Sequence, residues 1–191
     1  MPAAVGVFVM PLLVIFLPFL PAGLMLLVRT VSSASLAERI LALALALFCM
    51  ELAHMAFVDL RNISAVAQQS PDPRLQRFRK VTYSTIVSEV VGFYIALGSL
   101  PIGALIIIAS QLWFNSLAGI QLWPKNIPAV VSLPASDRLA VLIANGIGIG
   151  LLGLWPIQEI RTWSASGLLI LITLFLAVKY SGFSQSSDIS Q

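Results

Sequence analysis

The chain has 191 residues, of which 59% are hydrophobic and only 10% are charged. Soluble domains carry about 25% charged residues, so this composition excludes a water-soluble core. The net charge of +3 is small and scattered, which argues against nucleic acid as a partner. With Cys49 as its single cysteine and His54 as its single histidine, the chain has neither an intramolecular disulfide nor enough ligands for a tetrahedral metal site.

Long apolar runs follow one another along the chain and are separated by short polar segments. A helix needs about 20 apolar residues to cross the ~30 Å core of a bilayer. We therefore predict an all-α, polytopic membrane bundle, with residues 1–180 as one transmembrane domain and residues 181–191 as a disordered tail. The predicted spans are residues 5–28, 40–58, 81–98, 102–123, 138–155 and 162–180.

The first run, from Met1 to Val28, contains no charged side chain. It lacks the basic segment of a signal peptide, and its apolar stretch exceeds the usual length of about 7–15 residues, so we expect it to be retained as a membrane helix. Proline removes a backbone donor, and this run contains four prolines. We therefore predict a kinked or partly irregular first helix.

The stretch from Val81 to Trp123 is almost uncharged and too long for a single span. Its centre, from Gly98 to Gly103, places Pro101 between two glycines, which favours a tight turn. Six spans with the N-terminus inside put eight of the eleven Lys and Arg residues on the cytoplasmic side, whereas five spans put only six there. Because positive residues accumulate in cytoplasmic loops, we predict six helices with both termini inside, and five helices as the alternative.

Small residues recur at helical spacing on the second, third and fifth predicted helices. Such strips let a neighbouring backbone approach closely, so we expect these three helices to form the tight centre of the bundle. The same spacing is equally compatible with docking of a separate subunit. The helix-packing candidates are Ala42, Ala46, Ala53, Ser88, Gly92, Gly146 and Gly150.

Three ionisable residues, Glu51, His54 and Glu89, lie inside predicted spans. A charge at the centre of a span costs about 2.5–3.5 kcal/mol, so each must be paired, neutralised or hydrated. Both glutamates fall near mid-membrane, and no basic residue lies in the same two spans. One interpretation is a proton or cation site, in which the carboxyls share a proton that His54 relays. The other is that both carboxyls bond to neighbouring helices and only fix their packing.

The fourth predicted helix offers a second candidate site. Gln111 and Asn115 are one turn apart on one face, and together with Trp113 they would line a polar pocket. The competing interpretation is that these amides simply bond to another helix, which contributes about 0.6 kcal/mol each.

No catalytic constellation accompanies these residues. Glu51 and His54 spell the Glu-x-x-His of di-iron bundles, but those proteins need a second histidine, which is missing. An enzyme therefore has the least support. We predict a non-enzymatic subunit, scaffold or assembly factor of a membrane complex, whose partners are the lipid bilayer and other membrane subunits.

The alternative function is a small carrier, or the membrane-embedded substrate-binding component of a transporter, that uses Glu51, Glu89 and His54. The sequence names no cofactor and no metal. Its apolar runs predict an integral, multi-pass location and fit an inner, plasma or organellar, thylakoid-type membrane equally well.

Overall fold

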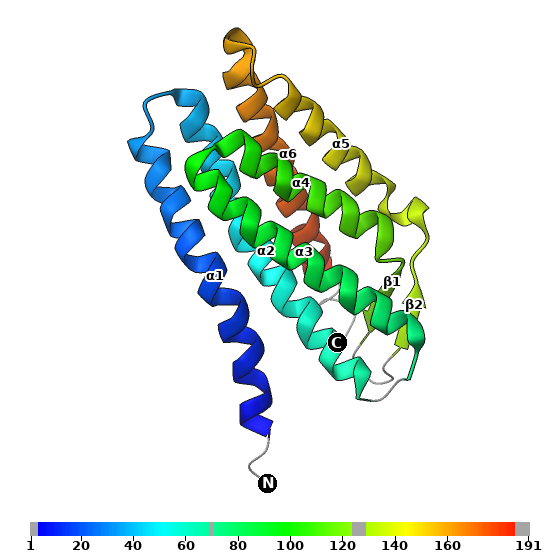
Figure 1. Cartoon of the computed structure of the whole chain (residues 1–191). Helices are drawn as coiled ribbons and strands as arrows, with labels where there is room; N and C mark the ends of the chain where they lie inside the picture. Colours follow the sequence, from blue (N-terminus) through cyan, green and yellow to red (C-terminus); the bar gives the residue numbers. More distant parts are fainter. Residues whose placement is uncertain (1–3, 69–70, 124–128, 186–191) are drawn as a thin grey trace.

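The computed structural model describes residues 4–68, 71–123 and 129–185. Within these residues six α-helices run up and down beside one another (Figure 1), and each is long and apolar enough to cross a membrane, α5 when counted together with the 3-10 turn Ala135–Arg138 before it. The predicted all-helical class is confirmed, with six helices rather than five. They are α1 (Ala4–Ser32), α2 (Leu36–Ala67), α3 (Pro73–Gly98), α4 (Leu100–Leu117), α5 (Leu139–Gly153) and α6 (Arg161–Gln185).

Helix α1 is continuous through its prolines at residues 11, 18 and 21, so of the predicted kinked or partly irregular helix the irregular form is wrong. Each proline removes one amide donor, and the helical turns between the prolines are retained. The thiol of Cys49 donates a hydrogen bond to the carbonyl of Phe19 (3.4 Å) and thereby joins α2 to α1.

Helix α2 is much longer than the predicted span of residues 40–58. It begins at Ser35, whose side chain accepts a hydrogen bond from the backbone N–H of Glu38 (3.2 Å). It continues to Ala67 because residues 59–67 contain neither proline nor glycine, while Ile63 and Val66 extend its buried face. The predicted loop of residues 59–80 is therefore mostly helical.

The predicted helical hairpin between residues 81 and 123 is present, since α3 and α4 are separated at Ser99. The two helices approach closely at Gly103, where an added Cβ would lie 2.5 Å from the Cβ of Ala96. Arg29 of α1 donates to the carbonyl oxygens of Ala96 and Leu97 (2.9 and 2.8 Å). Carbonyls in the last turn of a helix have no helical partner, so Arg29 stabilises the end of α3.

Helix α4 ends at Leu117, earlier than predicted, and is followed by a short antiparallel hairpin of β1 (Ile120–Trp123) and β2 (Ala129–Ser132). Gly119 stands between helix and strand with φ of +61°, a conformation that favours glycine. The buried guanidinium of Arg138 donates to the carbonyl oxygens of Asn115 and Ile120 (3.2 and 3.1 Å) and holds the hairpin against α4.

Helix α6 is preceded by a short 3-10 turn, Gln158–Ile160, and runs to Gln185. The first five residues of the predicted tail are therefore helical. The remaining six lie outside the described residues.

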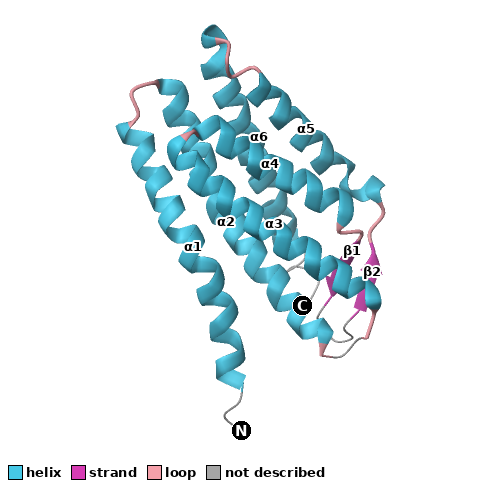
Figure 2. Ribbon diagram, in the orientation of Figure 1, coloured by secondary structure: helices cyan, strands magenta, loops and turns pink. Residues whose placement is uncertain are grey.

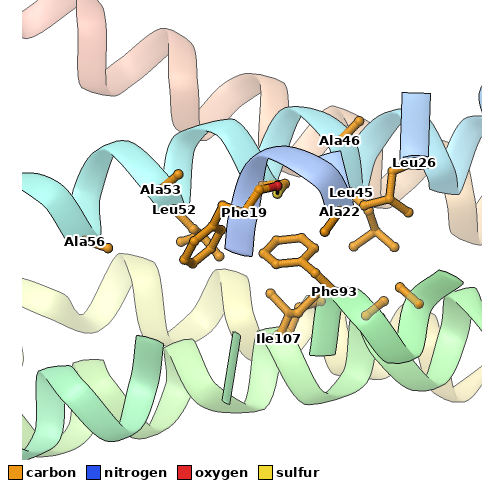
Figure 3. Close-up of a cluster of buried hydrophobic side chains, with 14 of the residues drawn as sticks. Phe19, Ala22, Leu26, Leu45, Ala46, Leu52, Ala53, Ala56, Phe93 and Ile107 are labelled. Carbon is orange, nitrogen blue, oxygen red and sulfur yellow. Dashed lines mark hydrogen bonds between the residues drawn. The ribbon is translucent and has the colours of Figure 1, made fainter. Parts of the chain in front are cut away.

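Helix α2 occupies the centre of the bundle. In its most apolar window 61% of the residues are buried, compared with 17% for α5 and for α6. The expected tight centre of the second, third and fifth helices is therefore wrong, because α5 lies at the periphery. Figure 3 shows that α1 contributes to the core instead, with the ring of Phe19 edge-on to that of Phe93 at 5.8 Å.

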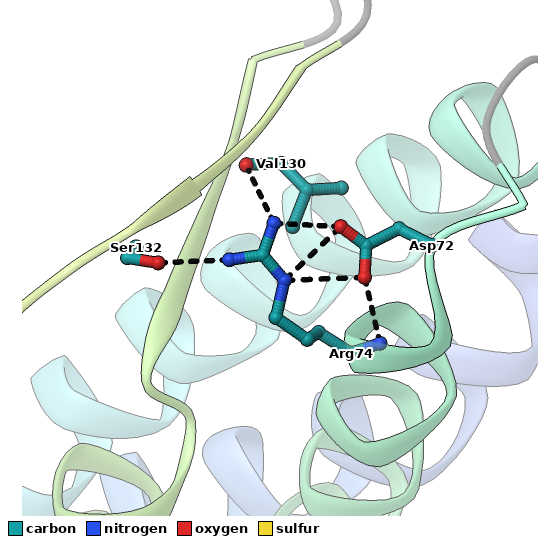
Figure 4. Close-up of polar contacts among 4 residues, drawn as sticks. All are labelled: Asp72, Arg74, Val130 and Ser132. Atoms are coloured by element: carbon teal, nitrogen blue, oxygen red, sulfur yellow. Dashed lines mark hydrogen bonds and ion pairs between the residues drawn. The ribbon is translucent and has the colours of Figure 1, made fainter.

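The connection between α2 and α3, the β1–β2 hairpin and the end of α6 lie at one end of the bundle (Figure 2). There Asp72 caps α3 by accepting a hydrogen bond from the backbone N–H of Arg74 (2.8 Å). The Arg74 guanidinium also donates to Ser132 (2.8 Å) and to the carbonyl of Val130, which ties α3 to β2 (Figure 4). Hydrogen bonds from Arg74 hold the pKa of the Asp72 carboxyl below its usual value.

Candidate functional site

The two glutamates singled out in the sequence are both buried in the bundle. Glu51 on α2 is 5% exposed, and Glu89 on α3 is 2% exposed. Each has its own set of hydrogen-bond partners, from different helices. The expected sharing of one proton between the two carboxyls is therefore not what the contacts show.

Glu51 forms an ion pair with Lys179 of α6 and accepts a hydrogen bond from the hydroxyl of Tyr180 (2.8 Å). We call these three residues the Glu51 cluster. Sequence reasoning missed it because a counter-ion was sought only in the two spans that carry the glutamates. The pair ties α2 to α6 and leaves Glu51 with a compensated charge.

Within the described residues Glu89 forms no ion pair, and its carboxylate accepts a hydrogen bond from the side-chain amide of Gln111 on α4. Both residues line a small cavity between α2, α3 and α4, which we call the Glu89 cavity. The volume of this cavity is about 20 Å³, which is room for one water molecule. Its polar lining consists of Asp59, Thr82, Thr85, Glu89 and Gln111.

The two threonines of the Glu89 cavity differ in their bonding. The hydroxyl of Thr82 donates to the carbonyl of Phe78 (3.0 Å), as is common within a helix. The hydroxyl of Thr85, 4% exposed, has no hydrogen-bond partner within the described part of the chain. An unsatisfied buried hydroxyl costs about 1–3 kcal/mol, so the cavity contains a polar group that a bound species would stabilise.

Asp59 connects the Glu89 cavity with the Glu51 cluster. It lines the cavity, is only half-buried, and interacts electrostatically with both Glu89 and Lys179. Asp59 lies one residue beyond the predicted second span, which ends at residue 58. The only signal in the sequence is that residues 59–67 contain neither proline nor glycine, and α2 continues through them with Asp59 two turns beyond Glu51.

The remaining residues of the predicted proton or cation site and polar pocket lie elsewhere. His54 is exposed and belongs to neither cluster. Trp113 is 54% exposed on the outside of α4. Asn115 uses its side-chain amide to donate to the backbone carbonyl of Gln111 (2.8 Å). Of the three candidates on the fourth helix, only Gln111 reaches a buried polar site.

Most packing candidates on α2 and α3 lie inside the bundle. A Cβ at Gly92 would meet Cγ1 of Ile107 at 2.6 Å, so α4 approaches α3 closely there. Ser88 is half-buried. The buried members of the set are Ala42, Ala46, Ala53 and Gly92.

The glycines of α5 divide between two faces. A Cβ at Gly148 would lie 3.1 Å from the side chain of Ile108, so this glycine packs against α4. At Gly146, Gly150 and Gly153 an added Cβ would find nothing within 4 Å among the described residues. The predicted internal packing of Gly146 and Gly150 is therefore wrong for this chain by itself.

Comparison with known proteins gave no match: no family model, no curated protein and no solved structure is similar to this chain. In the parts of the chain that the structure describes, no group of three or more His, Cys, Asp or Glu side chains could hold a metal ion.

Proposed function

We propose that this chain is a non-enzymatic, multi-pass membrane protein that serves as a subunit, scaffold or assembly factor of a larger membrane complex. The observation that carries the proposal is the outer face of α5. Gly146 and Gly150 stand one turn apart there with open space in front of them, and Gly153 follows one turn further on. We call these three residues the α5 glycine face.

A glycine face gives lipid little to contact, whereas it lets a second helix approach until the two backbones touch. Ile143 and Ile147, which are 53% and 49% exposed, stand beside the glycines and form a ridge next to this groove. A ridge beside a groove is the surface that helix packing uses. The α5 glycine face therefore supports docking of a helix from another membrane protein.

The size of the Glu89 cavity favours this role over a carrier for an organic substrate. Sites for organic molecules have volumes of roughly 300–1,000 Å³. The Glu89 cavity, with room for one water molecule, is far smaller. The buried carboxyls therefore lend no support to a substrate-binding component for organic compounds.

The experiment is native mass spectrometry of the tagged protein, extracted from its own membrane in a mild detergent. We expect partner proteins in fixed stoichiometry with the native chain. Replacing Gly146 and Gly150 together by Leu should remove them, because two large side chains fill the groove. Gly98→Leu is the matched control, since Gly98 is also open but lies at the end of α3. A native chain that carries no partner would contradict the proposal.

A further inference from the structure

The Glu89 cavity has a chemistry that the packing of three helices does not require. All five of its polar side chains offer oxygen atoms: two carboxyls, two hydroxyls and one amide. The nitrogen of that amide is already engaged, since it donates to Glu89. A set of oxygen donors is what hard cations prefer.

The hydroxyl of Thr85 is the group that most clearly points to a ligand. It is buried, lines the cavity and has no partner in the described residues, although it could bond to a backbone carbonyl as Thr82 does. An oxygen left free beside two carboxyls is available to a bound cation.

The size of the cavity restricts that cation to a small monovalent one. The cavity has room for a single water-sized species. Mg²⁺ usually keeps several of its waters and Ca²⁺ takes six to eight ligands, so neither fits this space. Lys179 is already paired with Glu51, so the charge of the cavity does not by itself select the valence of the cation, and the size of the cavity does.

We propose that the Glu89 cavity binds one dehydrated monovalent cation of the Na⁺ type, held by Asp59, Glu89 and the hydroxyl of Thr85. Entry is from the end of the bundle where α2 and α3 are connected, because Asp59 is half-buried and lies nearer to that end than Glu89 does. The site does not depend on the α5 glycine face, since the two lie on different helices.

A proton is the competing ligand, and the groups around Glu89 define that competition. Helix α2 contributes Asp59 and Cys49, α4 contributes the neutral Gln111, and Lys179 of α6 acts through Asp59. The test must therefore vary Na⁺ at constant pH.

The experiment uses the full chain in phosphatidylcholine nanodiscs. Binding of radioactive Na⁺ is measured directly, with choline chloride replacing NaCl at constant ionic strength. In parallel, a hydrophobic carbodiimide labels neutral carboxyls in apolar surroundings, and mass spectrometry locates the label. We expect one Na⁺ per chain, and labelling of Glu89 that Na⁺ prevents and choline does not.

Two pairs of variants make the test specific. Thr85→Val keeps the shape of the side chain and should weaken Na⁺ binding by about tenfold or more, because it removes one oxygen ligand of the cation. Thr173→Val is the matched control, since that hydroxyl lies on the exposed side of α6 and bonds to the carbonyl of Leu169. Glu89→Gln should abolish Na⁺ binding, whereas Glu159→Gln, at an exposed position in the turn before α6, should leave it unchanged.

Two results would overturn the proposal. Labelling of Glu89 that responds to pH but not to Na⁺, with no bound radioactivity, would show that the site takes only a proton. Equal Na⁺ binding by the native chain and by Thr85→Val would show that the Thr85 hydroxyl is not a ligand. Neither result would affect the docking of partners on α5, which the glycine variants test separately.

Discussion

Glu51 and Glu89 are the same residue type at the same depth in the bundle, yet their carboxyls have different partners and surroundings. Each lies sixteen residues from the end of its helix at the α2–α3 connection, which is about 24 Å at 1.5 Å per residue. Glu51 has a lysine and a tyrosine as partners. Glu89 has the neutral amide of Gln111 as its partner, and it lines a small cavity with the hydroxyl of Thr85, which is unpartnered among the described residues.

The difference shows two ways of placing a carboxyl inside an apolar bundle. A buried charge is stabilised when an opposite charge and hydrogen bonds satisfy it, as in the Glu51 cluster. Polar groups that stay incompletely satisfied in a cavity instead mark a place where another species can bind. The Glu51 cluster is therefore a structural tie between α2 and α6, and the Glu89 cavity is the place to look for a ligand.

The largest effect should come from breaking the Glu51 cluster. Lys179→Met leaves Glu51 buried without its counter-ion, and we expect the free energy of unfolding to fall by about 3 kcal/mol, the lower end for buried pairs. The lower end applies because the side chain of Lys179 is 26% exposed. The measurement is the fraction of folded protein in detergent against temperature, read by size-exclusion chromatography.

The double variant Glu51→Gln with Lys179→Met provides the control for this effect. It removes both charges at once, so most of the lost stability should return. If the double variant were no more stable than Lys179→Met alone, the two residues would not be coupled, and the structural role of the cluster would be wrong.

The same substitution at the two glutamates should give unequal results. Glu51→Gln leaves the ammonium of Lys179 without a carboxylate and should cost about 1.5–3 kcal/mol, the range for hydrogen bonds to charged groups. Glu89→Gln retains a carbonyl oxygen that accepts from Gln111, so the cost should stay below about 1 kcal/mol. Both are measured by the melting assay described above. If Glu51→Gln and Glu89→Gln lowered the stability equally, the distinction between the Glu51 cluster and the Glu89 cavity would be wrong.

The sequence predicted much of this fold because its information is periodic and local. Six apolar runs and the glycine–proline turn near residue 100 predicted six helices and the α3–α4 hairpin. Helix ends were less accurate, because α2 continues through a polar stretch that has no helix breaker, and only its packing shows that it stays helical. The β1–β2 hairpin is too short to have a pattern of its own.

The candidate sites depended on contacts between helices, which the sequence does not contain. It identified Glu51, Glu89 and Gln111 individually, but pairing them required knowing which faces meet. The long-range partners of Glu51, from 128 residues further along the chain, could not be found by inspecting its own span. The same limit explains why the prediction for the α5 glycines was wrong. Gly148 packs inward against α4, whereas Gly146 and Gly150 face outward.

The smallest loss of stability should come from breaking an exposed ion pair. That pair is the reference for the buried pair of Glu51 and Lys179. Asp72 and Arg74 interact at the surface of the α2–α3 connection, with side chains 19% and 50% exposed. Since Arg74 holds the pKa of Asp72 below its usual value, the ionised carboxyl contributes stability above the unfolded-state pKa of about 3.9 and loses that contribution as the pH falls through its lower folded-state pKa.

Arg74→Ala should therefore raise the pKa of Asp72 towards its usual value, which a carbon-13 NMR titration of the Asp72 carboxyl would detect. The Arg74 variant should lower the melting temperature slightly near neutral pH. The part of this decrease in melting temperature that comes from the ionised Asp72 carboxyl should vanish in strong acid. It should also shrink in about 1 M choline chloride, where the Debye length is ~3 Å, whereas the effect of Lys179→Met should persist because that pair is largely shielded from solvent. Equal salt sensitivity of the two variants would mean that Lys179 and Glu51 are as hydrated as the surface pair, and would leave the Glu51 cluster without its buried character.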